Sequence, residues 1–347
     1  MVEKIPIAEF LKRGKHSPIV DVRSPAEFLK GHIPGAINLP LFENKEREIV
    51  GILYKNKSRQ EAIRKGLEIV GPKMSALVDE AVLLADTGKI LIYCWRGGMR
   101  SASVAWLFEA AGLQVYLLEG GYKQYRKHIR ETMFQNRHLL VLGGLTGSGK
   151  TILIKALKAA GEPVVDLEGL ANHRGSAFGG VGLDTQPSTE HFENLLHEQM
   201  AKLPTDSFVW VEDESRRIGE LFQPEYFHNI LRTSQVVFAR ISDEERREIL
   251  IKEYSNQPHD ELIEAVKLLT KRAGGLLTKQ ALLALDEKDY GKVVDLLLPY
   301  YDKQYSFGLK QRSDSSILSL DLTKMSESDR IITLSRIRQK LEREKNE

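Results

Sequence analysis

The only cysteine of this 347-residue sequence, Cys94, lies in the segment 93–101, YCWRGGMRS. The apolar run directly before it predicts a buried strand, and the apolar spacing of residues 103–110 predicts a helix. Backbone N–H groups of a glycine loop and a first helical turn converge on the sulfur and on any anion beside it. Arg96 and Arg100 add positive charge, which further favours the thiolate. The segment therefore predicts an activated cysteine beside an anion site.

A second chemical motif is the glycine-rich segment 143–151, GGLTGSGKT. It fits the pattern GxxxxGK[ST] from Gly144 to Thr151, between an apolar strand at 139–142 and a helical segment at 152–160. The backbone N–H groups of such a loop point at a phosphate chain, the lysine neutralises its terminal oxygens, and the hydroxyl can hold Mg²⁺. The motif predicts binding of a phosphate or diphosphate without specifying nucleotide hydrolysis. The residues expected to bind it are Gly144, Gly147, Ser148, Gly149, Lys150 and Thr151.

A carboxylate after a neighbouring strand is expected to complete a magnesium site with Thr151. Asp213 follows the apolar strand at 207–211 and is the first candidate. Glu212 is an equally good candidate, because the register at the end of the strand is not visible in the sequence. A solvated loop carboxylate is the alternative for either residue.

A polar, glycine-rich loop follows the predicted strand at 163–168, which ends in Asp166 and Glu168. Loops at this edge of a parallel sheet usually line the ligand crevice. Arginines just after the strand at 207–211 can clamp phosphate oxygens through two parallel hydrogen bonds. The residues expected to contact the ligand or its phosphates are His173, Arg174, Arg216 and Arg217.

The segment 123–138 is basic, contains a single acidic residue, and is predicted to be a linker helix. Tyr122 and Tyr125 are interleaved with its charges. A solvated connecting helix and a basic, aromatic-bearing surface that contacts RNA are both consistent with this pattern. The residues assigned to RNA contact in the second case are Lys123, Arg126, Lys127 and Arg130.

Composition limits the classes of protein that this sequence can encode. With 50 basic and 48 acidic side chains, a formal net charge of +2 gives no global electrostatic case for nucleic-acid binding, so any such case must be local. One cysteine excludes an intramolecular disulfide framework and suits a reducing compartment. No signal-peptide core or membrane-spanning apolar run is present, so we expect a cytoplasmic protein that does not bind membranes.

Strands alternate with helices along most of the chain, which predicts α/β structure with parallel sheets covered on both faces. Residues 43–87 read as mostly helical, and long amphipathic segments follow residue 242, at 243–255, 258–273, 276–286 and 289–300, with a charged helix from Ser326. We therefore predict two domains. The first spans 1–130, and the second spans 131–347 with a helical C-terminal region from about 242.

The first domain resembles the rhodanese-like family. The segments 21–28 (DVRSPAEF) and 31–40 (GHIPGAINLP) are similar to its opening signature, and 93–101 resembles its sulfur-carrying loop. One departure is that Arg100 stands six residues after Cys94, where ordinary single-domain rhodaneses have five. The longer loop resembles that of rhodanese-related phosphatases, which favours a phosphate-bearing donor over bare thiosulfate.

The sequence around the phosphate-binding loop predicts a second domain of parallel α/β architecture. A rhodanese-like domain fused to such a domain resembles the bacterial tRNA 2-selenouridine synthase family. Besides the loops already described, the segments 166–176 (DLEGLANHRGS) and 214–219 (ESRRIG) carry this resemblance. The family implies a transferase that acts on the wobble uridine of tRNA. The sulfur of 2-thiouridine is geranylated by geranyl diphosphate, and selenium from selenophosphate then displaces the geranylated sulfur. It implies the anticodon stem-loop as partner, no covalently bound cofactor, and catalytic roles for Cys94, Arg96 and Arg100.

Two other functions remain open from the residues. One is a sulfurtransferase or phosphatase fused to a kinase-like nucleotide domain, which would act without tRNA. The other is a non-catalytic module that only binds partners, against which the presence of Cys94 with its arginines counts.

Overall fold

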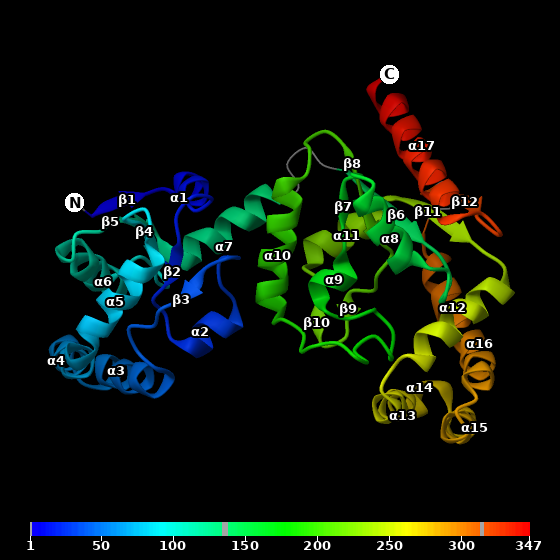
Figure 1. The fold of residues 1–347 in the computed structure, drawn as a ribbon, viewed down its shortest axis with the longest axis horizontal. Helices are drawn as coiled ribbons and strands as arrows, with labels where there is room; N and C mark the ends of the chain where they lie inside the picture. The colour runs from blue at the N-terminus through cyan, green and yellow to red at the C-terminus, as the bar shows by residue number, and fades with distance from the viewer. Residues whose placement is uncertain (1, 134–137, 313–315) are drawn as a thin grey trace. The chain divides into compact units, whose positions relative to one another are not determined.

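The computed structural model describes residues 2–133, 138–312 and 316–347. The chain divides into two compact units, Met1–Met133 and Phe134–Glu347, close to the boundary expected at residue 130. Each unit is built on a five-stranded parallel sheet with helices around it, which confirms the predicted α/β class (Figure 1). Among the described residues no helix is both long and apolar enough to cross a membrane.

The sheet of the first unit has the strand order β1-β5-β4-β2-β3. Alternate residues of its central strand enter two different cores, Ile90 and Ile92 on one face and Leu91 and Tyr93 on the other. Both faces are therefore covered, which is why this strand is apolar from Ile90 to Tyr93. The sequence does not predict β1, because only its last residue is buried. The strands are β1 (Glu3–Ile5), β2 (Ile19–Asp21), β3 (Ile37–Asn38), β4 (Lys89–Tyr93) and β5 (Gln114–Leu118).

Helices of the first unit pack on both faces of this sheet. Helices α5 (Met74–Leu84) and α6 (Met99–Ala110) supply Leu77, Val104 and Phe108 to one core. Helices α1 (Ile7–Arg13) and α7 (Gly121–Thr132) supply Phe10 and Ile129 to the other. The remaining helices are α2 (Pro25–Lys30), α3 (Asn44–Asn56), α4 (Arg59–Val70) and the short η1 (Gly71–Lys73).

The sheet of the second unit has the order β12-β11-β6-β8-β7. Its central strand β6 runs directly into the glycine-rich loop, and α8 begins at the lysine of that loop. A short antiparallel hairpin, β9–β10, follows the third strand in the chain. The strands are β6 (His138–Gly143), β7 (Val164–Val165), β8 (Phe208–Glu212), β9 (Arg217–Ile218), β10 (Leu221–Phe222), β11 (Gln235–Arg240) and β12 (Ile317–Asp321).

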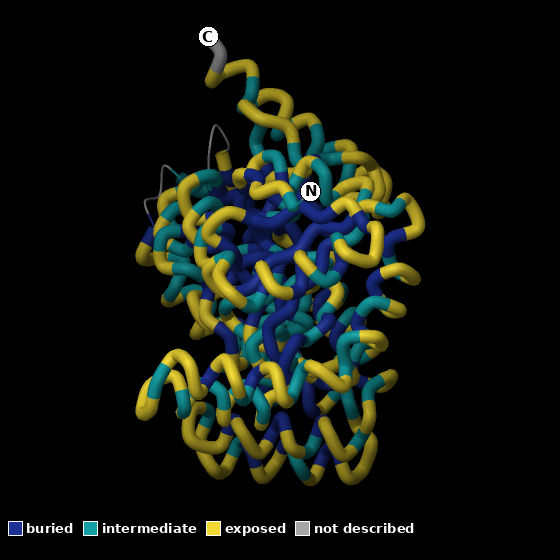
Figure 2. The backbone as a smooth tube through the Cα atoms, turned by 90° about the vertical axis from the view of Figure 1, so that its left-hand side faces the viewer, coloured by how far each residue is buried: buried dark blue, intermediate teal, exposed yellow. Residues whose placement is uncertain are grey.

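Figure 2 shows buried segments of the backbone in dark blue and exposed ones in yellow. The buried clusters among the described residues of the second unit include the following two. One core joins the sheet to α8, with Leu140, Leu153 and Trp210 buried in it. The other lies among the C-terminal helices, where Leu262, Ala281 and others are buried. The helices are α8 (Lys150–Ala159), α9 (Leu167–Ala171), α10 (Thr189–Lys202), α11 (Glu225–Thr233), α12 (Asp243–Ser255), α13 (His259–Leu268), α14 (Thr270–Ala273), α15 (Gly275–Asp286), α16 (Tyr290–Leu309) and α17 (Glu327–Asn346).

The C-terminal region differs in detail from the expected helices. The helix predicted at 258–273 is divided into α13 and α14, and the one predicted at 289–300 continues past Pro299 to Leu309. The region also supplies the edge strand β12, where Ile317 pairs with Val236 of β11. This strand was not predicted, although Ile317, Leu318 and Leu320 are apolar, and none of its residues is fully buried.

The predicted linker helix corresponds to α7, which ends at Thr132. Residues 134–137 of the predicted helix, including Arg137, lie outside the described residues. His138, its last residue, is the first residue of β6.

Candidate functional site

The cysteine loop lies at the carboxyl end of β4, where two glycines allow it to pack on the turn before α7. Gly97 has φ of 65°, in the region that favours glycine. A Cβ at Gly121 would lie 2.3 Å from the carbonyl oxygen of Cys94. The amide of Tyr122 donates to that same oxygen at 2.9 Å. The path of the loop is therefore fixed from both ends.

The Cys94 sulfur is buried and lies 3.1 Å from the hydroxyl of Ser101, with which it can form a hydrogen bond. Ser101 lies in the first turn of α6 and also donates to the carbonyl of Gly98 at 3.2 Å. This hydroxyl can accept from a thiol or rotate to donate to a thiolate. Ser101 was not among the predicted site residues, although its place in the first helical turn, seven residues after the cysteine, was visible.

The two arginines of the loop differ in their surroundings. Arg96 is exposed, whereas Arg100 forms an ion pair with Glu27 of α2, with Nη1 2.6 Å from Oε2. Burial alone would raise the pKa of Glu27, but the hydrogen bond and charge of Arg100 outweigh it and the pKa is lowered. The positive charge expected beside Cys94 is therefore partly neutralised by a carboxylate that the sequence did not single out.

The segment Asp21-Val22-Arg23 stabilises the N-terminal part of this domain. Arg23 and Asp21 are both buried and form an ion pair of 2.5 Å. Arg23 also donates to the carbonyl of Gly31 at 2.7 Å, and its guanidinium lies 4.0 Å from the ring centre of Tyr122. These residues have a structural role, because they connect the loop after α2 to α7, the helix that supports the cysteine loop.

In the second unit, the glycine-rich loop wraps around the start of α8 as predicted from its pattern. Gly147 and Gly149 have positive φ angles, and a Cβ at Gly144 would lie 2.4 Å from the Ser148 hydroxyl. Within the described part of the chain, that buried hydroxyl has no hydrogen-bond partner. Lys150 donates to the carbonyl of Gly144 at 2.7 Å. The loop therefore has the form of an anion cradle with a polar group ready for a ligand.

Lys150 is surrounded by carboxylates. Burial lowers its pKa, and the negative charges of Glu214, Glu168 and Asp213 oppose that shift. Burial and the neighbouring Glu168 raise the pKa of Glu214 to about 8. Thr151 donates to Glu168 Oε2 at 2.5 Å, so Glu168 is the carboxylate beside the motif hydroxyl. The sequence placed Glu168 in the crevice loop and Glu214 after β8 but assigned neither to the site.

Asp213 and Glu212 point into different environments, which resolves the register that the sequence left open. Asp213 accepts from Tyr305 at 2.7 Å and from Arg312 at 2.6 Å. Glu212 is fully buried and accepts from the amide of Leu167 at 2.8 Å, and burial raises its pKa well above the usual range. Asp213 is thus bonded by α16 and the segment after it, and its assignment to a magnesium site with Thr151 stays a prediction.

Among the described residues there is no group of three or more His, Cys, Asp or Glu side chains that could hold a metal ion. Thr151 and Glu168 nevertheless offer the oxygen ligands that Mg²⁺ takes together with substrate phosphates. The donor set fits an ion held mainly by its phosphate ligand, with Glu168 in place of Asp213.

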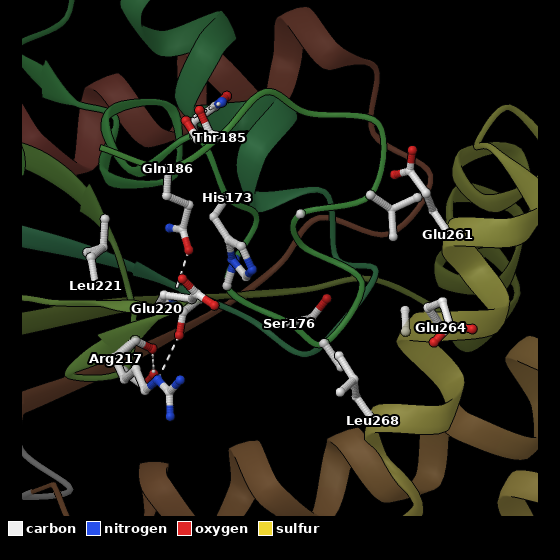
Figure 3. A pocket seen from close by; sticks show the side chains of 18 of the residues that line it. His173, Ser176, Thr185, Gln186, Arg217, Glu220, Leu221, Glu261, Glu264 and Leu268 are labelled. Atoms are coloured by element: carbon white, nitrogen blue, oxygen red, sulfur yellow. Dashed lines mark hydrogen bonds between the residues drawn. The ribbon is translucent and has the colours of Figure 1, made fainter. Parts of the chain in front are cut away.

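A pocket of about 1520 Å³ lies in the second unit (Figure 3). It is enclosed by the loop 172–189, the hairpin β9–β10 and helices α13 and α14. His173 and Arg217 line it, and Arg217 donates to the carbonyl of Gly219 at 2.7 Å.

The other two predicted phosphate contacts lie outside the residues that line this pocket. Arg174 approaches Glu253 at 3.5 Å and Arg216 approaches Glu225 at 3.4 Å. The structure therefore brings His173 and Arg217 together at one cavity, and it pairs Arg174 and Arg216 with carboxylates of α12 and α11.

The predicted RNA-contacting residues of α7 are not equivalent. Lys123, Lys127 and Arg130 are exposed, and Lys127 lies 3.8 Å from Glu131. Arg126 is buried, so the prediction that it lies on an open basic surface is wrong. A helical repeat could not show this, because Arg126 lies at the margin between the basic and apolar faces.

These features define a class of protein, a rhodanese-like domain joined to a P-loop domain. Residues 7–128 match the rhodanese-like domain family, and residues 137–330 match the family described as the tRNA 2-selenouridine synthase AAA domain. The tRNA 2-selenouridine synthase of Sulfurovum sp. is 35% identical over 87% of this chain and 91% of that protein. The one of Nitrosomonas europaea is 40% identical over 64% of this chain and 59% of that protein. The chain belongs to the tRNA 2-selenouridine synthase family.

A solved structure matches the first unit. The N-terminal domain of a putative ATP/GTP binding protein from Clostridium difficile 630 is 44% identical, covers 37% of this chain and 98% of that structure, and has a TM-score of 0.34.

Proposed function

We propose that this protein is a transferase that replaces the sulfur of 2-thiouridine by selenium at the wobble position of tRNA. One observation carries the proposal. A single chain of this family presents a nucleophilic cysteine on one sheet and a phosphate-binding loop on another. Two anion sites suit a reaction with two phosphate-bearing donors.

We assign geranyl diphosphate to the glycine-rich loop. The sulfur of 2-thiouridine attacks the first carbon of the geranyl group, the carbon–oxygen bond to diphosphate breaks, and diphosphate leaves. The amides of the loop, the Ser148 hydroxyl and Lys150 stabilise the negative charge that develops on this leaving group. Mg²⁺, held by Thr151 and Glu168, would supply further neutralisation of the diphosphate.

We assign selenophosphate to the cysteine loop. The Cys94 thiolate attacks phosphorus, the phosphorus–selenium bond breaks, and hydrogen selenide leaves. The selenide adds to the base carbon that carries the geranylated sulfur and geranylthiol leaves, while water hydrolyses the phosphorus–sulfur bond and returns the thiolate with release of phosphate. Cys94 presents a nucleophile to this donor, and Ser101 donates to its thiolate. The phosphate oxygens accept from the amides of the loop, with Arg96 and Arg100 as the nearest positive charges. Lys123, Lys127 and Arg130 contact the phosphates of the anticodon stem-loop.

Stepwise reconstitution tests the proposal. The full chain is mixed with a 2-thiouridine anticodon stem-loop and geranyl diphosphate, and selenophosphate is added afterwards. We expect mass spectrometry of the nucleosides to show the geranylated base first and 2-selenouridine only after the second addition. An unthiolated stem-loop is the control. If the protein instead turns over thiosulfate or a phosphoester without tRNA and leaves the nucleosides unchanged, the sulfurtransferase or phosphatase interpretation replaces this one.

A further inference from the structure

The glycine-rich loop is held at two points by the C-terminal helical region, which lies outside its sequence motif. Arg246 of α12 donates through Nε to the carbonyl of Thr146 at 2.9 Å. The amide of Gly144 donates to the hydroxyl of Tyr305 on α16 at 3.1 Å. Arg246 also forms an ion pair with Asp302, which stands three residues before Tyr305 on α16. The two helices are therefore connected to each other as well as to the loop.

The Tyr305 hydroxyl has a fixed direction. A backbone amide can only donate, so the hydroxyl accepts from Gly144 and gives its own hydrogen to Asp213 Oδ2 at 2.7 Å. Burial and the charge of Asp213 raise the pKa of Tyr305 well above its usual range, so the hydroxyl keeps this hydrogen at neutral pH. The phenol therefore links the loop to the residue that follows β8.

Asp213 is itself anchored through its other oxygen. Arg312 donates to Oδ1 at 2.6 Å, and the two side chains are only 0% and 6% exposed. Arg312 also donates to the carbonyls of Leu231 and Arg232 near the end of α11, at 2.9 and 3.0 Å. Both oxygens of the carboxylate therefore have partners within the unit, and one of them is directed at Tyr305.

Two consecutive glycines make room for this arrangement. A Cβ at Gly143 would lie 2.9 Å from the Tyr305 hydroxyl, and a Cβ at Gly144 would lie 2.4 Å from the hydroxyl of Ser148. Among the residues that the structure describes, the buried Ser148 hydroxyl has no hydrogen-bond partner. Gly144 therefore lies between the tyrosine and the polar group that is left for a ligand.

The ring of Tyr305 also adjoins the motif lysine. Lys150 Nζ lies 5.5 Å from the ring centre, within the range of a cation–π contact. The same ammonium group donates to the carbonyl of Gly144 at 2.7 Å. Tyr305 and Lys150 therefore bind the two polar backbone groups of one residue, its N–H and its C=O, at the first position of the motif.

We propose that Tyr305 is a positioning residue of the diphosphate site, which holds the first glycine of the loop so that the Ser148 hydroxyl faces the ligand. The inference rests on the proposed function, because it takes diphosphate as the ligand of the loop. Tyr305 acts through the loop and not on the reacting atoms. Asp213 in turn orients the tyrosine hydroxyl, a role that is independent of a metal ion.

Calorimetric titration of the full chain with inorganic diphosphate, without added Mg²⁺, tests this assignment. Tyr305→Phe keeps the ring and removes the hydroxyl. We expect it to weaken binding about three- to tenfold, the usual effect of losing one neutral hydrogen bond. Tyr300→Phe, on the same helix with its ring centre 5.3 Å from that of Tyr301, is the matched control and should bind like wild type. Wild-type affinity of Tyr305→Phe would overturn the inference.

A double-mutant cycle separates positioning from a general effect on the fold. In a Ser148→Ala background, the additional loss caused by Tyr305→Phe should shrink to about twofold or less, because the group that Tyr305 positions is gone. Hydrogen exchange of the Gly144 amide should be faster in Tyr305→Phe than in wild type, while the amides of β6 stay protected. Losses that simply multiply, or a Gly144 amide that exchanges as in wild type, would contradict a positioning role.

Asp213→Asn is a second test, which keeps the tyrosine and decides the question if Tyr305→Phe does not fold. Without Mg²⁺, an Asp213 that served only as a metal ligand would leave the affinity for diphosphate unchanged. Loss of its negative charge alone would strengthen the binding of an anion. Positioning through Tyr305 instead predicts weaker binding, so unchanged or stronger binding by this variant overturns the inference.

Failure of the proposed function looks different. If wild type binds diphosphate but does not geranylate the thiolated stem-loop, the proposed function is wrong and the titrations still decide the role of Tyr305. If wild type does not bind inorganic diphosphate, the ligand assigned to the loop is wrong and the inference fails with it.

Discussion

The cysteine loop and the phosphate-binding loop have the same backbone arrangement but differ in the charged side chains that surround them. Each follows the central strand of a parallel sheet, bends at glycines with positive φ, and leads into a helix whose first amides face the loop. At the cysteine loop, however, the arginine is paired with one carboxylate and the sulfur has a hydroxyl neighbour. At the phosphate-binding loop, a buried lysine is surrounded by three carboxyl groups.

This difference indicates how the two loops divide the work. A phosphate-binding loop that balances several buried charges can receive a multiply charged diphosphate and a cation together. A loop with few buried charges keeps a nucleophile reactive and its anion site small. The common backbone provides the amides, and the surrounding side chains decide which chemistry they serve.

Replacing the nucleophile should separate the two loops most sharply. With Cys94→Ser we expect no detectable 2-selenouridine, because a serine hydroxyl is not ionised near neutral pH. Geranylation of the thiolated stem-loop should continue at the wild-type rate, because the other loop is intact. Both products are measured by mass spectrometry of the nucleosides. Normal selenation by this variant would show that the sulfur has no part in the reaction.

Replacing the lysine should have the converse effect. Lys150→Ala is expected to reduce geranyl transfer by about two to three orders of magnitude, since it removes a cation from the leaving group. Lys155→Ala, at an exposed position on the same helix, is the matched control and should retain the wild-type rate. A pre-geranylated stem-loop should still be selenated by Lys150→Ala. Loss of that second step as well would mean that the loops do not act separately.

Removing the hydroxyl beside the sulfur should have a smaller effect. Ser101→Ala deletes a hydrogen bond to a charged group, which typically contributes roughly 1.5–3 kcal/mol, so we expect selenation to slow by roughly ten- to 150-fold. Ser103→Ala is the control, because that hydroxyl donates to the carbonyls of Met99 and Arg100 in the same helix. Geranylation should be unchanged in both variants. Equal selenation rates would remove Ser101 from the site.

Local pattern was enough to predict both loops and their sheets. Residues 90–93 and 139–142 are apolar throughout, and glycines stand where the backbone needs positive φ, so motif and fold were visible together. The contacts that tune each loop come from distant positions in the chain. Glu27 reaches Arg100 across 73 residues, and Tyr305 reaches Asp213 across 92. Contacts between such distant residues follow no regular sequence spacing, so they could not be predicted from a single sequence.

The same limit explains the assignments that changed. Asp213 and Glu212 are adjacent, and only the register of β8 decides that Glu212 enters the core. Glu168 was visible as a polar residue after a strand, but its contact with Thr151 depends on the packing of α9 against the sheet. The edge strand β12 was missed although three of its five residues, Ile317, Leu318 and Leu320, are apolar.

Neutralising Glu27 should have the smallest effect and isolates the counter-charge of the cysteine loop. Glu27→Gln keeps a side chain that can complete the capping box of α2, so the change removes mainly the ion pair with Arg100. At neutral pH we expect the free energy of unfolding to fall by about 1 kcal/mol or less, as for other partly exposed pairs. Because the pKa of Glu27 is lowered in the folded protein, its stabilisation is present above 4.5 and is lost as pH falls through the folded value.

The gap between wild type and Glu27→Gln should therefore close in acid. Hydrogen exchange of the amides in β4 and β5 measures the stability of the first unit separately from the second. Glu80→Gln, on an exposed position of α5, controls for the loss of one carboxylate. A gap that stays constant from neutral pH to about pH 3.5 would mean that Arg100 gains nothing from the charge of Glu27. The cysteine loop would then keep its full positive charge, and the contrast with the phosphate-binding loop would rest on the lysine site alone.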